Sequence, residues 1–233
     1  MDSGAAILQV CHPEILVDPQ VDPLIFDGDD FLQCGQELCE LILKNYREWL
    51  SADGFEANIS LGGSMVNDNI ENYYLSPYEL GYGHIIKFDH EFVGRRALEA
   101  MKGKEHRKKV TLKWHKDDVL KVFASLYNDG DRYKFMDMPA SHYATLPYDL
   151  VTKGGNAIGL SHYPVYTSNV RSWISLAVVD ANAAKPGTEV SILWGEPDGG
   201  SKKPTVERHI QTEMKATVHP CPISVTAREI YKT

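Results

Sequence analysis

The chain has 233 residues, of which 43% are hydrophobic and 24% are charged, so it is long enough to bury a core and too apolar for wholesale disorder. No apolar run approaches the roughly 20 residues that span a bilayer, and the N-terminus lacks a signal-peptide pattern, which predicts a cytoplasmic protein without membrane contact. The net charge of −8 argues against nucleic-acid binding. The four cysteines and nine histidines lack metal-ligand spacing, so we expect free thiols and no metal site.

The N-terminal region is acidic and contains one strong helical pattern. Residues 1–43 hold nine Asp and Glu and no Lys or Arg, and three early prolines favour an extended or irregular path. We therefore expect an irregular acidic segment over 1–28. From Asp29 or Asp30, both favoured N-cap residues, apolar side chains recur at helical spacing as far as Leu50. This spacing predicts a long amphipathic helix.

Shorter elements follow and complete an α+β region over 29–104. The alternating residues 55–63 predict a strand, and the Asn-rich segment 66–74 is too polar for a core element and reads as a loop. Residues 83–88 alternate again and predict a second strand. A helix is expected to begin near position 93 or 94 and to end at Gly103, since glycine is favoured just past a helix C-terminus.

From residue 105 onward the sequence consists mostly of short strands separated by turn signals such as "KGGN", "KPG" and "EPDGG". The predicted elements are strands at 108–114, 156–163, 171–180, 188–195 and 207–219, and a short helix at 117–126. Strands this short and evenly spaced predict a small antiparallel barrel or sandwich over 105–233. The basic run at 102–116 is interpreted as a solvated turn and an exposed strand face rather than a polyanion site.

Several tyrosines and one carboxylate surround the glycine turn "GYG" and form the candidate binding chemistry. They are Tyr73, Tyr74, Tyr78, Glu79 and Tyr82. Aromatic faces can stack a flat heterocycle, a carboxylate can accept two N–H bonds from a ring edge, and glycine allows close backbone approach. The combination suits a pterin or a purine. Packing of the tyrosines against the core is an equal alternative.

The stretch "SPYELGYGHIIKFDHEFVGRRALEAM" resembles a segment of the glycine-cleavage T-protein (aminomethyltransferase) family, in which a Thr/Ser-Pro-x-Glu-x-Gly-x-Gly turn precedes a strand and a helix. The matching residues are Ser76, Pro77, Glu79, Gly81, Gly83, Lys87, Phe88, Asp89, Phe92, Val93, Gly94, Arg95, Ala97 and Leu98. The downstream stretches "RKKVTLKW" and "PGTEVSILWG" resemble strands of the same family, so the resemblance covers about residues 44–233. The stretches "NYREWL" and "YKFMDMP" are closest to the branch of tetrahydrofolate-dependent vanillate and syringate O-demethylases.

The resemblance implies a fold, a cofactor and a reaction. The fold would be a partial T-protein-like folate domain with a long helix, short strands and a helix, followed by a small antiparallel β-barrel. The reaction would be methyl transfer to tetrahydrofolate, by O-demethylation of a methoxylated aromatic acid. By resemblance Tyr74 and Tyr78 would serve as channel wall or proton donors in catalysis. Cofactor contacts would come from Glu79 and Tyr82 at the pterin or channel, and from Lys87 and Arg95 at the folate carboxylates. The alternatives are a structural hydrogen-bond acceptor for Glu79 and a helix-surface charge for Arg95.

The chain departs from the family in length, because it resembles only about the C-terminal half of an enzyme. Two classes of function therefore remain open: a methyl transferase completed by another chain, and a non-catalytic fragment that acts as a binding or structural module. Within the family, glycine-cleavage aminomethyltransferase is a further alternative. We expect weak or absent tetrahydrofolate binding by the isolated chain. We also expect association through the 30–90 region, as a homodimer or with a complementing N-terminal chain.

Overall fold

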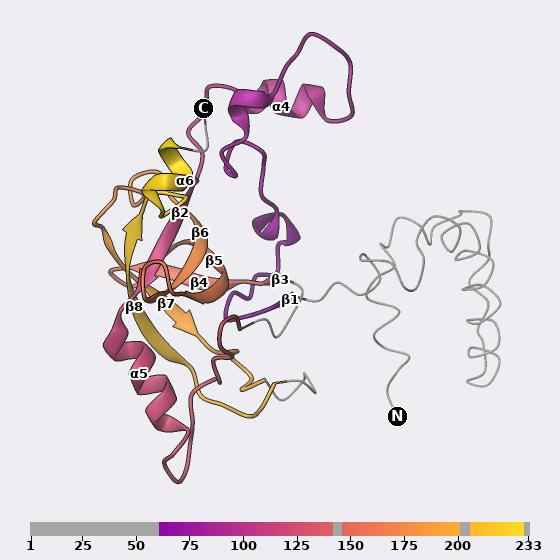
Figure 1. Ribbon diagram of the computed structural model, residues 1–233. Coiled ribbons are helices and arrows are strands. Elements are labelled where there is room, and N and C mark those ends of the chain that lie inside the picture. Colours follow the sequence, from indigo (N-terminus) through magenta and orange to yellow (C-terminus); the bar gives the residue numbers. More distant parts are fainter. Residues whose placement is uncertain (1–60, 142–145, 201–205, 231–233) are drawn as a thin grey trace, which may run out of the picture. The chain divides into compact units, whose positions relative to one another are not determined.

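The computed structural model describes residues 61–141, 146–200 and 206–230, all within the unit spanning Asn58–Thr233 (Figure 1). The predicted acidic segment and long helix lie outside the described residues, as do all the cysteines except Cys221, which is a free thiol. The described part mixes helices with strands, which confirms the α+β class. Within it, no helix has both the length and the apolar composition that crossing a membrane requires.

Six antiparallel strands close into a barrel in the order β2-β6-β5-β4-β7-β8 (Figure 1). The strands are β2 (Lys108–Trp114), β4 (Asp149–Lys153), β5 (Asn156–Thr167), β6 (Ser172–Val179), β7 (Glu189–Trp194) and β8 (Thr212–His219). The barrel confirms the sequence prediction, and β4 is a strand that the prediction omitted. In β8, Met214, Ala216 and Val218 are fully buried while Glu213 and Lys215 are exposed, which is the alternation expected of a strand with one buried face.

The "KGGN" turn joins β4 to β5 in the predicted manner. Lys153 pairs with Asn156, and the two glycines between them have positive φ angles of 58° and 82°. A two-residue hairpin with positive φ at both central residues matches the twist of the flanking strands, and glycine adopts it without steric cost. The local sequence therefore determines where this hairpin lies.

The core fills the barrel and extends under α5 (Lys116–Ser125). Val119 and Val122 of this predicted helix are buried, and its Asp118 accepts a hydrogen bond from the Lys215 amide at 2.8 Å. Trp114 meets the ring of Trp194 edge to face at 5.5 Å. A short C-terminal helix that the sequence analysis did not predict, α6 (Val225–Glu229), is capped by the Ser224 hydroxyl.

The connection between the first short strand and the barrel is a long arm, here defined as residues 66–107 (Figure 1). It carries the 3-10 turns η2 (Ile70–Tyr73) and η3 (Gly83–Ile85) and the helix α4 (Arg95–Met101). None of its described side chains is buried. The arm therefore has no core of its own.

The structure confirms one element predicted in the arm and corrects another. Helix α4 begins after Gly94 and ends before Gly103, as predicted, and both glycines have positive φ. The strand predicted over 83–88 is wrong, because this segment contains η3, in which the Ile85 amide donates to the Tyr82 carbonyl at 3.0 Å. A strand requires a hydrogen-bonded neighbour, and no strand in the described part of the chain pairs with this segment.

The strand predicted over 55–63 is described only at its end, as β1 (Leu61–Gly62). It pairs in parallel with β3 (Leu146–Pro147), directly before β4. This short sheet places the start of the arm beside the barrel.

Candidate functional site

The tyrosine turn, residues 73–82, is held by reciprocal hydrogen bonds between Ser76 and Glu79. The Ser76 amide donates to Oε2 of Glu79 at 2.7 Å, and the Glu79 amide donates to the Ser76 hydroxyl at 3.3 Å. This is the capping-box arrangement, in which a Ser/Thr and a Glu three residues later satisfy each other's backbone donors. Tyr82 closes the turn through a 2.8 Å bond from its amide to the Pro77 carbonyl.

Glu79 also anchors the turn to the end of the arm. Its Oε1 accepts a 2.6 Å hydrogen bond from Nε of Arg107, and Nη2 of Arg107 donates to the Tyr74 carbonyl at 3.2 Å. Partial burial alone would raise the pKa of Glu79, but the hydrogen bonds from Ser76 and the Arg107 guanidinium outweigh it and lower the pKa below the usual value. Glu79 is therefore an ionised anchor with a partner at each oxygen.

Tyr78 is packed within the arm through its ring and its hydroxyl. Its ring stacks on His106 at 5.0 Å with only 5° between the planes, and its hydroxyl donates to the Leu98 carbonyl at 3.1 Å. A Cβ at position 83 would lie 2.8 Å from the Tyr78 ring, so Gly83 makes room for it. Tyr78 thus connects the tyrosine turn to α4.

Tyr74, Tyr82 and Lys87 are the predicted site residues that reach solvent. The side chains of Tyr74 and Tyr82 are 63% and 48% exposed, and Lys87 is exposed as well. Nζ of Lys109 lies 4.8 Å from the centre of the Tyr82 ring, a cation–π contact. The Tyr74 hydroxyl has no hydrogen-bond partner among the described residues. These side chains remain available to a ligand.

Arg95 is engaged within the arm. Its guanidinium bonds Glu91 at 2.8 Å and Glu99 at 2.9 Å, and it also donates to the His90 carbonyl at 3.0 Å. The structure therefore brings Tyr74, Tyr78, Glu79 and Tyr82 together in one turn, while Arg95 stabilises the start of α4.

A folate requires aromatic faces, an acceptor for the polar edge of its pterin, and cations for its carboxylates. The exposed rings of Tyr74 and Tyr82 and the ammonium of Lys87 suit two of these needs. Glu79 and Arg95 are already occupied by partners within the arm. The described residues therefore do not make a complete folate site by themselves.

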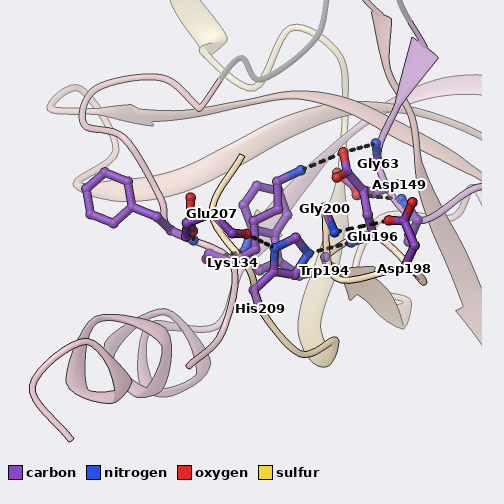
Figure 2. Close-up of polar contacts among 12 residues, drawn as sticks. Gly63, Lys134, Asp149, Trp194, Glu196, Asp198, Gly200, Glu207 and His209 are labelled. Carbon is purple, nitrogen blue, oxygen red and sulfur yellow. Dashed lines mark hydrogen bonds and ion pairs between the residues drawn. The ribbon is translucent and has the colours of Figure 1, made fainter. Parts of the chain in front are cut away.

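A second polar group lies beneath the start of the arm and is here called the buried charge cluster: Lys134, Asp149 and Glu196. Figure 2 shows Glu196 between Gly63 and His209, with Asp149 beside it. Lys134, Asp149 and Glu196 are only 1%, 1% and 4% exposed. Nζ of Lys134 lies 3.5 Å from Oε1 of Glu196 and 5.0 Å from the centre of the Trp194 ring. These groups cannot touch a substrate, so their role is structural.

Asp149 is the most perturbed acid among the described groups. Burial raises its pKa to about 6, against the opposing effects of the Lys134 ammonium and of hydrogen bonds from Ser64, while the Glu196 carboxylate raises it further. Its Oδ1 accepts from the Ser64 amide at 3.2 Å, and its Oδ2 has no hydrogen-bond partner in the described part. An ionised carboxylate is thus poorly compensated here.

Two further hydrogen bonds fix the loop around Glu196. The Glu196 amide donates to Nε2 of His209 at 2.8 Å, and Nδ1 of His209 lies 2.8 Å from the Glu207 carbonyl (Figure 2). Because Nε2 accepts a hydrogen bond, the ring proton lies on Nδ1, which donates to Glu207. The Glu207 carboxylate in turn accepts from the Phe135 amide at 2.6 Å.

The cluster holds Gly63 and Ser64, which lie just before the arm, against the barrel. The Gly63 amide donates to Oε1 of Glu196 at 3.3 Å, and the Ser64 hydroxyl donates to the Leu193 carbonyl at 2.5 Å. Gly63 has φ of +87°, and a Cβ there would lie 2.2 Å from the Tyr148 carbonyl oxygen. Only glycine fits this contact, so the close approach of the segment before the arm to Tyr148 depends on it.

Sequence reasoning missed the buried charge cluster. A single acid within the otherwise apolar "PYDLV" is the available signal for Asp149, because an unpaired charge is rare in a buried strand. Nothing local marks Lys134 or Glu196 as its neighbours. The reciprocal Ser76–Glu79 pair had a recognisable spacing, Ser-x-x-Glu, that indicates a cap.

Comparisons with known proteins relate the chain to enzymes of aromatic compounds. No protein-family model matches it. It is 46% identical over 187 residues to syringate O-demethylase of Sphingobium sp. (strain SYK-6), which covers 80% of this chain and 40% of the relative. It is also 34% identical over 148 residues to sesamin methylene transferase of Sinomonas sp. (strain No.22), which covers 59% of this chain and 33% of that relative. The chain thus spans well under half of each relative.

Proposed function

We propose that the chain belongs to the aromatic O-demethylases and supplies the C-terminal part of a tetrahydrofolate-dependent methyl transferase that acts on a methoxylated aromatic acid. The identity of 46% to syringate O-demethylase carries this proposal. A match over 80% of the chain leaves about 46 of 233 residues outside it, so it includes the tyrosine turn wherever it begins. The second relative, named as a methylene transferase, is consistent with one-carbon transfer.

In this proposal the barrel and the buried charge cluster position the arm, and the tyrosine turn forms one wall of the reaction site. Loss of a methyl group from an aryl ether leaves a phenolate oxygen, which needs a proton from a general acid. Tyr74 is the better of the two predicted donors, because its side chain is 63% exposed and its hydroxyl has no partner in the described region. Tyr78, whose hydroxyl bonds the Leu98 carbonyl, would act as a positioning residue.

The remaining walls are proposed to come from a complementing N-terminal chain. The arm exposes large apolar side chains that would be covered by such a partner, including Val66, Ile85 and Val93, which are 70%, 62% and 104% exposed. A homodimer through the same face is the other arrangement consistent with this exposure. If neither forms, the incomplete folate site favours the second candidate, a non-catalytic binding or structural module.

Calorimetric titration with tetrahydrofolate tests the proposal. The full chain would be measured alone and then mixed with a polypeptide comprising the part of the Sphingobium enzyme that this chain does not match. We expect weak or absent tetrahydrofolate binding by the chain alone. The mixture should bind tetrahydrofolate saturably, and to a greater extent than the added polypeptide does by itself. A mixture that binds no better than its separate components would contradict complementation.

A further inference from the structure

Residues 62–65, the segment directly before the arm, lie against Asp149 at the end of a barrel strand. Asp149 is the first residue of β4 and shares a face of that strand with Val151, a fully buried core residue, so its side chain points toward the barrel interior. The Ser64 amide donates to its Oδ1 at 3.2 Å. We infer that residues 62–65 form a proton-linked latch, which stays closed while Asp149 is protonated and opens more often once Asp149 is ionised.

The latch is attached by hydrogen bonds rather than by core side chains. The Tyr148 amide donates to the Gly62 carbonyl at 2.8 Å, and the Met65 amide donates to the Tyr148 carbonyl at 2.9 Å. The Ser64 hydroxyl accepts from the Leu150 amide at 2.9 Å. Within the segment only Met65 has a large apolar side chain, and it is half-buried. The segment can therefore open locally while the barrel core stays packed.

The charge of the buried cluster links this opening to a proton. The cluster holds one ammonium and two carboxylates, and the Lys134 ammonium lies 3.5 Å from Glu196. With both acids ionised, one excess negative charge is buried, and Oδ2 of Asp149 has no hydrogen-bond partner among the described residues. A proton on Oδ2 removes this charge and leaves Oδ1 to accept from Ser64. Opening lets water reach the carboxylate, so the ionised form gains more from opening than the neutral form does.

The neighbouring titratable groups do not produce the same dependence. The ring of His162 lies 5.9 Å from that of Tyr148, and burial lowers its pKa to about 4, so its protonation would favour opening as pH falls, which is the opposite sign. The other ionisable groups around the cluster are Lys134, Glu196, Asp198, Glu207 and His209. The inference goes beyond the proposed function, because it requires neither folate nor methyl transfer.

Hydrogen exchange of the Ser64 and Met65 amides in the full chain tests the inference. Both should exchange faster than core amides such as those of Leu112 and Val178, which need global unfolding. After correction for the intrinsic rate, their protection should fall about 50-fold between pH 4 and pH 7, because the pKa of Asp149 is about 6 in the closed state and returns to 3.8 when solvated. Asp149→Asn should keep the protection at its low-pH value throughout. Glu213→Gln, which neutralises an exposed acid of β8, is the matched control and should keep the fall.

Three results would overturn the inference: protection of Ser64 and Met65 that is equal at pH 4 and pH 7, the same fall in Asp149→Asn, or exchange no faster than that of the core amides. A carboxyl titration of Asp149 by nuclear magnetic resonance needs no variant. Its midpoint should coincide with that of the exchange profile, near pH 6, whereas a midpoint near 3.8 would also overturn the inference. None of these results affects the folate titration.

Discussion

Oε1 of Glu79 lies 2.6 Å from Nε of Arg107, although 28 residues separate them in the sequence. This ion pair joins the tyrosine turn to the residue directly before β2, and so relates the candidate reaction face to the barrel. Side-chain exposures of 13% for Glu79 and 25% for Arg107 make it less solvated than a typical surface pair. The acid that the family resemblance assigned to the cofactor is thus an anchor in this structure.

Replacing the anchor should loosen the turn without unfolding the barrel. We expect Glu79→Gln to destabilise the turn by about 1 kcal/mol, because a charge-assisted bond becomes a neutral one and the barrel core is not involved. Hydrogen exchange of the Gly81 and Tyr82 amides measures this effect. Arg95→Gln, which removes the more exposed pairs with Glu91 and Glu99, is the control, and equal protection of the turn in both variants would refute the anchor role.

Gly63 should be far less tolerant than another glycine with the same backbone angle. Gly63 and Gly187 both have φ of +87°, but a Cβ at Gly187 would meet nothing within 4 Å. Gly187→Ala should therefore cost only about 1–2 kcal/mol of conformational strain. Gly63→Ala adds the clash with the Tyr148 carbonyl and should cost at least about 3 kcal/mol or detach the arm. Denaturant unfolding compares the two, and similar losses would show that close approach to β4 is unimportant.

Asp149 predicts a defined dependence of stability on pH. Its pKa is raised from 3.8 to about 6 in the folded protein, so between these values the folded state binds the proton that the unfolded state has released. Its contribution to stability is fully present below pH 3.8 and falls by up to about 3 kcal/mol as pH rises to 6. Asp149→Asn should remove this contribution, so in denaturation curves recorded from pH 4 to 7 the stability difference between the variant and the unmodified chain should change by up to about 3 kcal/mol. An unchanged pH profile would mean that Asp149 is ionised in the fold.

His162 should make folding stability depend on pH in the opposite direction, over nearly the same pH range. Burial lowers its pKa from 6.5 to about 4, and its Nδ1 has no hydrogen-bond partner among the described residues. The unfolded state therefore binds the extra proton, and stability falls by about 2 kcal/mol as pH drops from 6.5 to 4. His162→Phe keeps a ring beside Tyr148 and Tyr163 and should remove this loss. The unmodified chain should be nearly flat where the two effects cancel, and a steep profile that neither variant changes would contradict both assignments.

The sequence predicted the parts of the fold that depend on local patterns. The strand at 108–114 has the predicted bounds, and the two glycines of "KGGN" determine their hairpin, because alternation and positive φ are properties of neighbouring residues. The segment 83–88 has the same alternation but no partner strand in the described region. Alternation shows which face of a strand would be buried, but not whether a neighbour exists to pair with it.

The candidate site was predicted less completely, because its geometry depends on distant contacts. The sequence pattern placed Tyr74, Tyr78, Glu79 and Tyr82 around one glycine turn, and in the structure these residues lie in one hydrogen-bonded turn, whereas their role in a site stays a prediction. It could not reveal that Glu79 is held by Arg107, since that pairing depends on the path of the whole arm. The burial of Lys134 with two carboxylates likewise arises only when β4, the loop after β7 and the segment between α5 and β3 meet.

Methyl transfer by a chimera tests the central claim most directly. Residues 61–230 of this chain would replace the matching part of the Sphingobium enzyme, and demethylation of syringate would be measured with tetrahydrofolate present. We predict activity within about tenfold of the parent, a loss of about 10²–10⁴-fold for Tyr74→Phe as expected of a general acid, and no loss for Tyr127→Phe, a control at a 91% exposed tyrosine. A folded chimera that binds tetrahydrofolate but releases no demethylated product would contradict the account.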